Sequence, residues 1–482
     1  MTNISINFTT DREEFLNDFM ELLRAYYPYV VIERDGDKVS LSIEQLGSNT
    51  YQCIIKDYQN PLYCSKNTIN LEQNADYVRQ KSEIKRHAKI ALYQYLQAKT
   101  GVSLPYGSLT GIRPTKLFHD LTARGIDAEK YFTDTLSVSP AKADLISSIC
   151  HNQQGVYCTD TDMADLFINI PICVSRCVYC SFLSAELSKI SKSVEPYCDL
   201  LHRDVADAVD MLSKAGKKIR SIYVGGGTPT SLTAEQLQRV LTPLDKVEFR
   251  EFTVEAGRPD TIDRTKLQVF KDFGVGRISV NPQTFNQKTL DEIGRKHTVD
   301  DIYKIYEIAK NMGFDVNMDL IAMLPNEDFE DFRRSVDSAV ALDPDNITVH
   351  TLAIKRGSAL KLDGYDNKTD ADLAENMVNY SIETLIGHGY MPYYMYKQKY
   401  MSGNLENIGY CKAGKECIYN IDIMEETHDV VACGAGGISK VVYLDQKRLE
   451  RLANPKGLDV YLERGEDNML KRREFFEEKF NS

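Results

Sequence analysis

Three cysteines in one short segment restrict what this chain can fold into more than any other feature. Cys173, Cys177 and Cys180 have the spacing C-x3-C-x2-C. They follow an apolar, strand-like run over residues 165–170 that ends at Pro171. We therefore expect the thiols just past the carboxyl end of a strand, where barrels and open parallel sheets hold their chemistry.

Three thiolates around one centre are soft ligands of the kind that iron-sulfur clusters select. A structural zinc site fits less well, because it takes four ligands and this loop contains no fourth Cys or His. On a four-iron cluster, three thiolates leave one iron without a protein ligand, and that iron can bind a substrate or a cofactor. The alternative is three ordinary buried thiols, since free cysteine often packs as a small apolar side chain.

The loop resembles that of the radical S-adenosylmethionine (SAM) superfamily, whose cluster uses its open iron to chelate the amino and carboxylate groups of the methionine moiety. Further segments are similar, in order and spacing, to the oxygen-independent coproporphyrinogen III dehydrogenase (oxidase) family. These segments are Val224-Gly225-Gly226-Gly227-Thr228-Pro229-Thr230, Val254-Glu255-Ala256, residues 277–285, Gly294-Arg295, Asp319-Leu320-Ile321, Leu324-Pro325 and Gly434-Ala435-Gly436. Residues 104–117 are similar to a segment of the longer, HemZ-type branch.

Length and composition indicate a multidomain enzyme without a membrane segment. The chain has 482 residues, more than one domain with a single hydrophobic core usually contains. Its residues are 43% hydrophobic and 27% charged, a composition typical of a soluble globular protein. No apolar run approaches the roughly 20 residues of a membrane span, and the first residues lack a basic signal region, so we expect a cytoplasmic protein. Eleven cysteines in so long a chain suit a reducing, low-oxygen compartment better than a disulfide framework.

The net charge of −12 argues against broad nucleic-acid binding, which needs a basic stripe. Anionic small substrates would then be met by local Arg and Lys side chains. Six basic residues in family-like stretches could pair with substrate carboxylates or form a solvated surface: Arg113, Lys116, Lys355, Arg356, Lys397 and Lys399.

Residues 1–105 are expected to form a small α/β domain, and residues 106–162 a helical connector. The hydrophobic periodicity predicts strands over residues 4–8, 39–43 and 50–56, and helices from about Asp11 and over residues 77–100. In the first helix the apolar side chains have helical spacing: Phe15, Phe19, Leu22, Leu23 and Tyr26.

Residues 163–370 alternate strand and helix as βα units do, which predicts an α/β fold with a partial (β/α)6 barrel, the barrel of radical SAM enzymes. The expected strands are residues 166–170, 221–224, 248–255, 277–281, 315–319 and 346–350, and the helices are residues 194–215, 234–244, 263–273, 300–312 and 329–342. Residues 371–482 are expected to form a C-terminal α+β cap, with a helix at 371–387 and short strands at 393–396, 417–423 and 429–433.

The resemblance also implies which residues contact the cofactor. The backbone at Gly226 and Gly227 would approach the methionine end, since glycine leaves room that side chains would block; a tight βα turn is the alternative. Carboxylate, amide and guanidinium groups suit ribose hydroxyls and the methionine carboxylate, while an apolar side chain suits adenine. The implied contacts are Phe167, Tyr179, Glu255, Gln283, Arg295, Asp319 and Ile321, with rim salt bridges or core packing as the alternatives.

The chain departs from the shorter branch of the family at three positions. Phe182 stands where that branch has a fourth cysteine, Phe167 stands in place of a tyrosine, and Asn169 stands in place of a histidine. Phe167 cannot offer a hydroxyl, and Asn169 cannot act as an imidazole would. These changes leave cluster binding intact and weaken the transfer of the porphyrinogen reaction.

Four other side chains allow a functional or a structural interpretation. Cys411, Cys417 and Cys433 could suggest a second cluster, but their loose spacing favours buried or free thiols. His350, near the end of the sixth predicted strand, would point into the barrel or into its rim.

The resemblance implies oxidative decarboxylation of two propionates of coproporphyrinogen III to vinyls, giving protoporphyrinogen IX. The cofactors would be a 4Fe-4S cluster and SAM, the electron donor a flavodoxin or ferredoxin, and no protein acid–base pair is expected, because the cofactor performs the hard step. The alternatives are a heme methyltransferase that opens the ring and a heme-binding chaperone. A tRNA-modifying enzyme fits the charge balance less well.

Overall fold

The computed structural model describes residues 5–27, 30–32, 37–71, 77–111, 113–182, 184–355, 357–365, 370–398 and 405–480. They form two compact units: one runs to Cys150 and includes Lys397, and the other begins at His151. The division into four domains stays a prediction. Within the described residues, no helix is long and apolar enough to cross a membrane.

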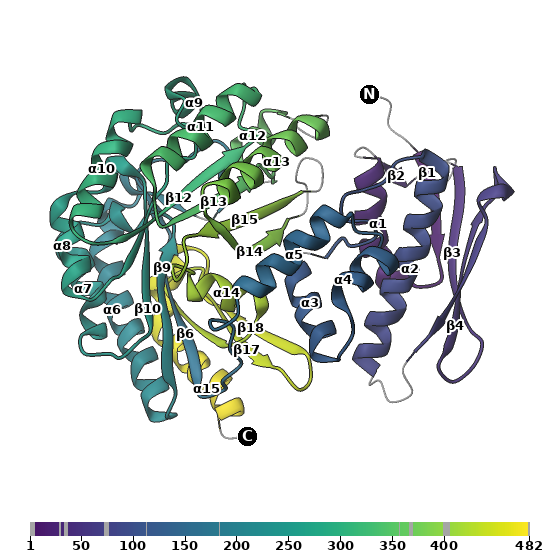
Figure 1. Ribbon diagram of the computed structural model, residues 1–482. Helices are drawn as coiled ribbons and strands as arrows, with labels where there is room; N and C mark the ends of the chain where they lie inside the picture. The colour runs from purple at the N-terminus through teal and green to yellow at the C-terminus, as the bar shows by residue number, and fades with distance from the viewer. Residues whose placement is uncertain are drawn as a thin grey trace. The chain divides into compact units, whose positions relative to one another are not determined.

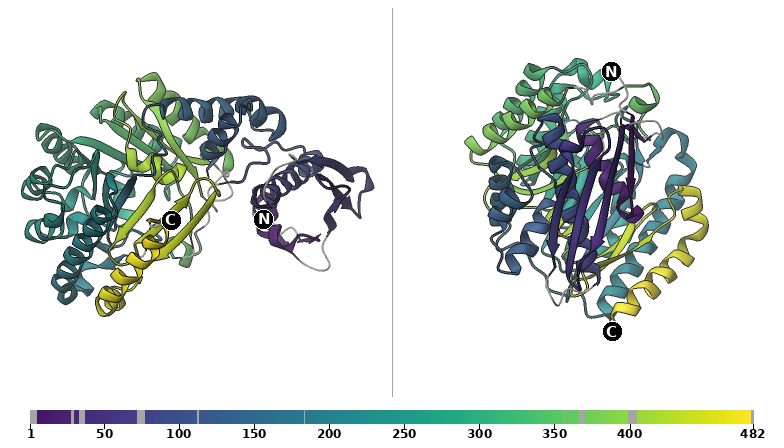
Figure 2. Two further views of the ribbon diagram at one scale, coloured as in Figure 1. Left: turned by 90° about the horizontal axis from the view of Figure 1, so that it is seen from below. Right: turned by 90° about the vertical axis from the view of Figure 1, so that its right-hand side faces the viewer.

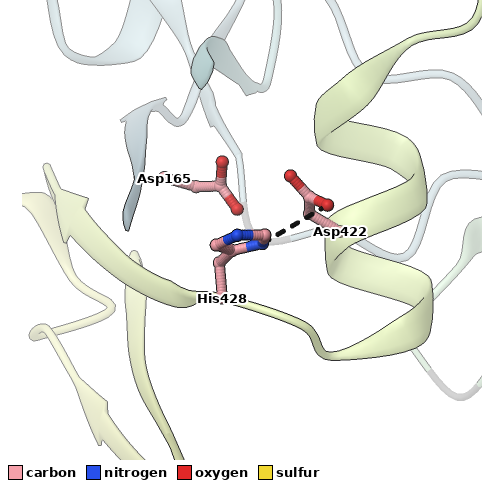
Figure 3. Close-up of side chains that lie close together, drawn as sticks. All are labelled: Asp165, Asp422 and His428. Carbon is pink, nitrogen blue, oxygen red and sulfur yellow. Dashed lines mark ion pairs between the residues drawn. The ribbon is translucent and has the colours of Figure 1, made fainter. Parts of the chain in front are cut away.

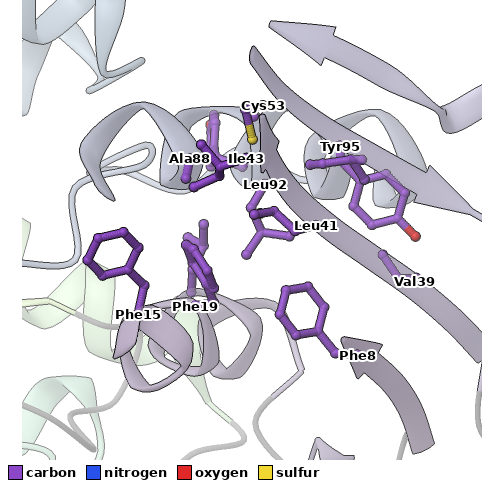
Figure 4. Packing of buried hydrophobic residues seen from close by; sticks show 14 of the residues in the cluster. Phe8, Phe15, Phe19, Val39, Leu41, Ile43, Cys53, Ala88, Leu92 and Tyr95 are labelled. Carbon is purple, nitrogen blue, oxygen red and sulfur yellow. The ribbon is translucent and has the colours of Figure 1, made fainter. Parts of the chain in front are cut away.

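The N-terminal unit is built on a sheet of order β2-β1-β3-β4-β5 (Figure 2, right). The strands are β1 (Ser5–Thr10), β2 (Val31–Ile32), β3 (Asp37–Gln45), β4 (Thr50–Asp57) and β5 (Ser65–Asn70). Helices α1 (Leu16–Tyr26) and α2 (Tyr77–Thr100) pack on the sheet through a buried apolar core (Figure 4). Val39, Leu41 and Ile43 alternate along β3 and are all buried, as expected for a strand with one face on a core.

The remaining helices of this unit include α3 (Pro114–Ala123), α4 (Ala128–Lys130) and α5 (Pro140–Asn152), with a π-helical turn at Tyr131–Thr135. Proline is the first residue of both α3 and α5, a position where its missing N–H costs no helical hydrogen bond. These helices all lie within residues 106–162, where the sequence predicts helical structure.

The second unit contains one open sheet of order β14-β15-β13-β12-β11-β10-β9-β6-β16-β17-β18 (Figure 1). Its centre is a parallel series, β6 (Met163–Ile170), β9 (Lys218–Gly226), β10 (Glu251–Gly257), β11 (Arg277–Val280), β12 (Asp315–Ala322) and β13 (Asn346–Thr351). Helices α6 (Ser191–Lys214), α7 (Ala234–Leu241), α8 (Arg264–Asp272), α10 (Val299–Asn311) and α11 (Phe329–Leu342) connect these strands on the outer face of the sheet (Figure 2, left). The predicted α/β partial barrel is confirmed, and the sheet does not close.

The C-terminal segments extend this sheet at both edges. They comprise β14 (Met391–Lys397), β15 (Glu406–Cys411), β16 (Asp429–Cys433), β17 (Ile438–Tyr443) and β18 (Arg448–Ala453), with helices α12 (Ala359–Leu362), α13 (Ala371–Gly387), α14 (Ile418–Glu425) and α15 (Leu458–Phe480). β15 runs antiparallel to β13, and β16 runs parallel to β6. The strands expected in a separate cap therefore belong to the same sheet as the barrel strands.

The strand predicted over residues 417–423 is wrong, because these residues form helix α14. The Glu251 carboxylate on β10 accepts hydrogen bonds from the backbone N–H groups of Ile418 and Tyr419, at 3.0 and 3.2 Å. A carboxylate at a helix N-terminus satisfies orphan N–H groups and stabilises the helix. This partner is distant in the sequence, so the local apolar pattern could not reveal it.

Candidate functional site

The three cysteines lie in the loop that follows β6. Pro171 separates β6 from a short strand, β7 (Ile172–Cys173), which pairs with β8 (Ala185–Glu186). The backbone N–H of Cys180 donates to the Cys177 carbonyl at 3.1 Å, so the loop turns between these two residues. Cys177 is buried, while Cys173 and Cys180 are partly exposed. The structure therefore places the predicted ligands in one loop beyond the end of a strand.

The separation of the three sulfur atoms can be compared with the geometry of a single zinc ion. Zinc holds sulfur at about 2.3 Å, so the sulfurs of one zinc site lie within roughly 4.6 Å of one another. Among the described residues, one group of three metal-ligating side chains lies within 4.8 Å, and it does not include these cysteines. The three sulfurs are therefore not all within 4.8 Å of one another, an arrangement that a cluster accommodates because it offers each thiolate a different iron.

The glycine segment, residues 225–228 at the end of β9, forms backbone hydrogen bonds with the start of the cysteine loop. Gly227 N–H donates to the Ile170 carbonyl at 2.9 Å, and Thr228 N–H donates to the Ile172 carbonyl at 2.8 Å. The Thr228 hydroxyl also donates to the Cys173 sulfur at 3.5 Å. A Cβ at residue 227 would lie 2.7 Å from both the backbone N and O of Ile172. Glycine is needed here because two backbone segments meet, a reason that the sequence did not indicate.

Asn169, at the end of β6, is enclosed by two glycine turns. Gly226 has φ +107°, and a Cβ there would lie 1.9 Å from the Asn169 side-chain oxygen. Gly434 has φ +89°, and its Cβ would lie 2.1 Å from the Asn169 carbonyl. The Asn169 amide donates to the Ala435 carbonyl. Asn169 therefore holds the two glycine turns together.

Glu255, on β10, lies against the glycine segment. A Cβ at residue 225 would approach its carboxylate to 2.7 Å. The hydroxyl of Tyr223, on β9, donates to Glu255 at 2.6 Å. Burial raises the pKa of Glu255, the Tyr223 hydrogen bond lowers it, and the charge of Asp319 raises it. Sequence reasoning missed Tyr223, although its place two residues before the first glycine on the same strand is a usable signal.

Gln283, three residues after β11, pairs with the carboxyl-terminal half of β12, which contains Asp319 and Ile321. Gln283 has φ +69°, an unusual conformation for a residue with a side chain. Its N–H donates to the Asp319 carbonyl at 2.9 Å, and its own carbonyl accepts from Ile321 at 3.0 Å, so backbone hydrogen bonds hold the strained residue. The Asp319 side chain accepts from Asn317 at 2.8 Å and lies 3.8 Å from His350. His350 lies opposite Ile321 in the strand pairing and thus beside Asp319.

Arg295 lies after a helix and not at the end of a strand. It follows helix α9 (Gln287–Glu292) and is buried against the cysteine loop. Its guanidinium donates to the Asn281 carbonyl at 2.9 Å and to the Tyr179 hydroxyl at 3.2 Å. Its Nε is buried without a hydrogen-bond partner among the described residues. Two of its three nitrogens therefore already bind protein groups.

Phe167 and the C-terminal cysteines lie in packed surroundings. Phe167 stacks on Tyr419, with ring centroids 6.0 Å apart and an angle of 16°. Tyr419 in turn stacks on Tyr223 at 4.3 Å. Cys417 donates to Glu251, whereas Cys433 lies beside Arg472. Cys411, Cys417 and Cys433 are all buried and form no group of metal ligands within the described part of the chain.

The basic residues differ in their surroundings. Lys397 is buried, and its ammonium lies 3.9 Å from the centre of the Tyr106 ring, so it packs within the protein. Burial lowers the pKa of Lys355, and the charge of Cys180 acts on it in the opposite direction. Arg356 and Lys399 lie outside the described residues.

Glu327, which follows β12, is a buried carboxyl group that sequence reasoning missed. It accepts from Thr284 at 2.6 Å, and its other oxygen has no partner among the described residues. Burial raises its pKa to about 7. The folded protein therefore holds this proton more tightly than the unfolded chain. The resulting stabilisation is complete below the ordinary pKa of glutamate and is lost as pH rises through 7.

Glu327→Gln should remove this loss, because an amide does not ionise. The difference in unfolding free energy, variant minus unmodified protein, should increase by about 2 to 3 kcal/mol when the pH is raised from about 5 to about 8. Urea unfolding at both pH values measures the difference. A constant difference across this range would contradict the assignment.

Comparison of the chain with known proteins identifies its family. Residues 168–339 match the family model of the radical SAM superfamily. The oxygen-independent coproporphyrinogen-III oxidase-like protein HemZ of Bacillus subtilis is 35% identical over 411 residues, 83% of this chain and 82% of that protein. The heme chaperone HemW of the same organism is 32% identical over 200 residues, 40% of this chain and 51% of that protein.

A solved structure agrees at the level of the fold. Coproporphyrinogen III oxidase HemN from Escherichia coli aligns with a TM-score of 0.52 at 20% identity, covering 68% of this chain and 73% of that chain. The cofactors of the superfamily, a 4Fe-4S cluster and SAM, suit the thiol set described above. The chain therefore belongs to the HemZ-type branch of the oxygen-independent coproporphyrinogen III oxidase family, within the radical SAM superfamily.

Proposed function

We propose that this chain is a radical SAM enzyme that acts on a tetrapyrrole, and that it converts two propionates of coproporphyrinogen III to vinyl groups. The observation that carries the proposal is the pair of backbone hydrogen bonds between the glycine segment and the cysteine loop. Gly227 and Thr228 donate to the backbone on either side of Pro171. This joins a loop suited to a cluster to a backbone segment suited to the methionine end of SAM. The name of the Bacillus subtilis relative supports the choice of substrate.

In this proposal Cys173, Cys177 and Cys180 hold the cluster. When bound, the cluster and SAM supply a 5′-deoxyadenosyl radical that removes a hydrogen atom from the substrate. The protein residues bind and orient. Glu255 is on β10 and Asp319 is on β12, with β11 between them, and the charge of Asp319 acts on Glu255. Their carboxylates suit the ribose hydroxyls.

Other residues complete the proposed SAM site. The backbone of Gly226 and Gly227 and the amide of Gln283 would meet the polar parts of SAM, and Ile321 would pack on adenine. Tyr179 and Phe167 would border the site. Arg295 would act by fixing Tyr179 and the cysteine loop, with its unpartnered Nε left for a carboxylate. Lys355, on which the charge of Cys180 acts, would meet an anionic substrate at this loop.

A heme-binding chaperone is the second candidate function, and two residues favour it. Phe167 has no hydroxyl and stacks on Tyr419, while Asn169 is enclosed by the glycine turns. Neither side chain offers the polar groups found at these positions in the shorter branch. The match to heme chaperone HemW points in the same direction.

An anaerobic assay separates these functions. The protein is reconstituted with iron and sulfide, supplied with a low-potential reductant such as reduced flavodoxin, SAM and coproporphyrinogen III, and followed by mass spectrometry. The proposal predicts 5′-deoxyadenosine, carbon dioxide and protoporphyrinogen IX. Heme binding without substrate-dependent turnover would favour the chaperone, and a methylated linear tetrapyrrole from heme would favour a ring-opening methyltransferase.

Tyr223→Phe tests the role of Glu255. The Tyr223 hydrogen bond lowers the Glu255 pKa, so its loss should raise that pKa further. Less of the carboxylate is then ionised at a given pH, and SAM affinity should fall by about tenfold, the effect of one hydrogen bond to a charged group. The pH below which affinity is lost should move upward. Equilibrium dialysis with SAM across pH measures both effects.

Tyr390→Phe is the matched control, because Tyr390 is buried and donates to the Pro344 carbonyl away from this site. It should leave SAM affinity and its pH profile unchanged. An unchanged pH profile in Tyr223→Phe would exclude ionised Glu255 from SAM binding.

A further inference from the structure

A second group of metal-ligating side chains lies outside the proposed active site. Asp165 is on β6, Asp422 is on α14, and His428 directly precedes β16 (Figure 3). One ligand atom of each lies within 4.8 Å of the other two. The three residues are 0%, 1% and 3% exposed. Segments that are distant in the sequence thus bring two carboxylates and an imidazole into a site closed to solvent.

Two atoms of this group lack partners. One oxygen of Asp165 accepts from the Ser221 hydroxyl at 2.6 Å, and the other has no hydrogen-bond partner among the described residues. The His428 Nδ1 lies 2.9 Å from the Thr427 hydroxyl and 3.4 Å from Asp422. Its Nε2 is also unpartnered within the described structure. A buried polar atom without a partner costs about 1 to 3 kcal/mol, so two in one place indicate a missing ligand.

The charges of the group indicate what that ligand is. The Arg220 guanidinium, itself 1% exposed, donates to Asp422 at 2.6 Å. With both carboxylates ionised and the imidazole neutral, the forms in which these groups bind a metal, they and Arg220 together carry one net negative charge. A metal cation would neutralise this charge and would also give both unpartnered atoms a partner.

We propose that Asp165, Asp422 and His428 bind one divalent transition-metal ion, with zinc as the reference ion and one carboxylate bound through both oxygens to complete four-fold coordination. Carboxylate oxygen and imidazole nitrogen are suitable zinc ligands at about 2.0 to 2.2 Å, which places pairs of ligand atoms within roughly 4.4 Å of each other. The three ligand atoms lie within 4.8 Å of one another, so metal binding needs at most a small contraction of the group. The Thr427 hydroxyl donates to Asp422 at 2.9 Å and orients this carboxylate.

The ion would fasten three elements of the sheet. β6 leads directly into the cysteine loop, and β16 pairs with β6 in parallel, with Val430 opposite Asp165. Helix α14 contributes Asp422 from between β15 and β16. The proposed role is therefore structural: the ion holds the strand that carries the cysteine loop, and it takes no part in the radical reaction.

The test removes the cluster so that its iron does not contribute. A Cys173→Ala/Cys177→Ala/Cys180→Ala variant is incubated with zinc, freed of loose metal by gel filtration, and analysed by plasma mass spectrometry and zinc X-ray absorption. We expect about one zinc per chain in a shell of oxygen and nitrogen only. Adding His428→Gln or Asp165→Asn should abolish the bound zinc, while His388→Gln, at an exposed histidine, should not.

Thermal melting keeps the result interpretable if a variant folds poorly. Zinc should raise the melting temperature of the triple variant but not that of the variant that also carries His428→Gln. A folded triple variant that retains no zinc would overturn the proposal, and so would a shell containing sulfur. In either case a proton or a water molecule would occupy the site, and the proposed function would stand unchanged.

Discussion

Cys177→Ser is expected to abolish cluster binding and all turnover. The variant changes one atom, so the loop can keep its backbone hydrogen bond from Cys180 to residue 177. A serine hydroxyl does not ionise near neutral pH and is a poor ligand for an iron-sulfur cluster. Without the cluster, the acceleration that enzymes provide, about a millionfold or more, should be lost. Iron and sulfide per chain and the formation of 5′-deoxyadenosine measure the effect.

Cys158→Ser is the matched control. Cys158 is a partly exposed free thiol in the same compact unit, and its sulfur accepts only a local hydrogen bond from the Asp160 N–H. This variant should keep full cluster content and activity. Full iron and sulfide content in Cys177→Ser would remove Cys177 from the ligand set, whatever the substrate.

The elements that follow local periodicity could be predicted from the sequence. Helices α2, α11 and α13 have the predicted bounds, and all six parallel strands lie where they were expected. Each of these helices has an apolar face at helical spacing, and each strand is an apolar run bounded by turn residues. Local sequence was sufficient because burial and intrinsic preference agree in these segments.

Elements and contacts that depend on distant partners could not be predicted. Helix α14 depends on Glu251, and β14 to β16 join the main sheet through pairings that no local pattern specifies. The same limit applies within the site. The residue types around the cluster loop could be inferred from the resemblance, but Tyr223 as the partner of Glu255, and Asn281 as an acceptor for Arg295, are tertiary contacts.

Gly227→Ala should destabilise the protein and separate the glycine segment from the cysteine loop. The new Cβ would lie 2.7 Å from the backbone N and O of Ile172 and 2.9 Å from the Ile170 carbonyl. These are backbone atoms and cannot rotate away as a side chain does, so one of the two segments must move. Overpacking of this kind costs about 3 kcal/mol, and a shift of about 1 Å at a reacting centre costs about a hundredfold in rate.

Urea unfolding and SAM binding measure the two effects of Gly227→Ala separately. Gly276→Ala, just before β11 in the same sheet, is the control, because a Cβ there meets nothing within 4 Å. It should match the unmodified protein in both measurements. If Gly227→Ala kept both its stability and its SAM affinity, the glycine segment would not be packed on the cysteine loop in solution. The structural basis for a joint cluster and SAM site would then be lost, even with all three cysteines in place.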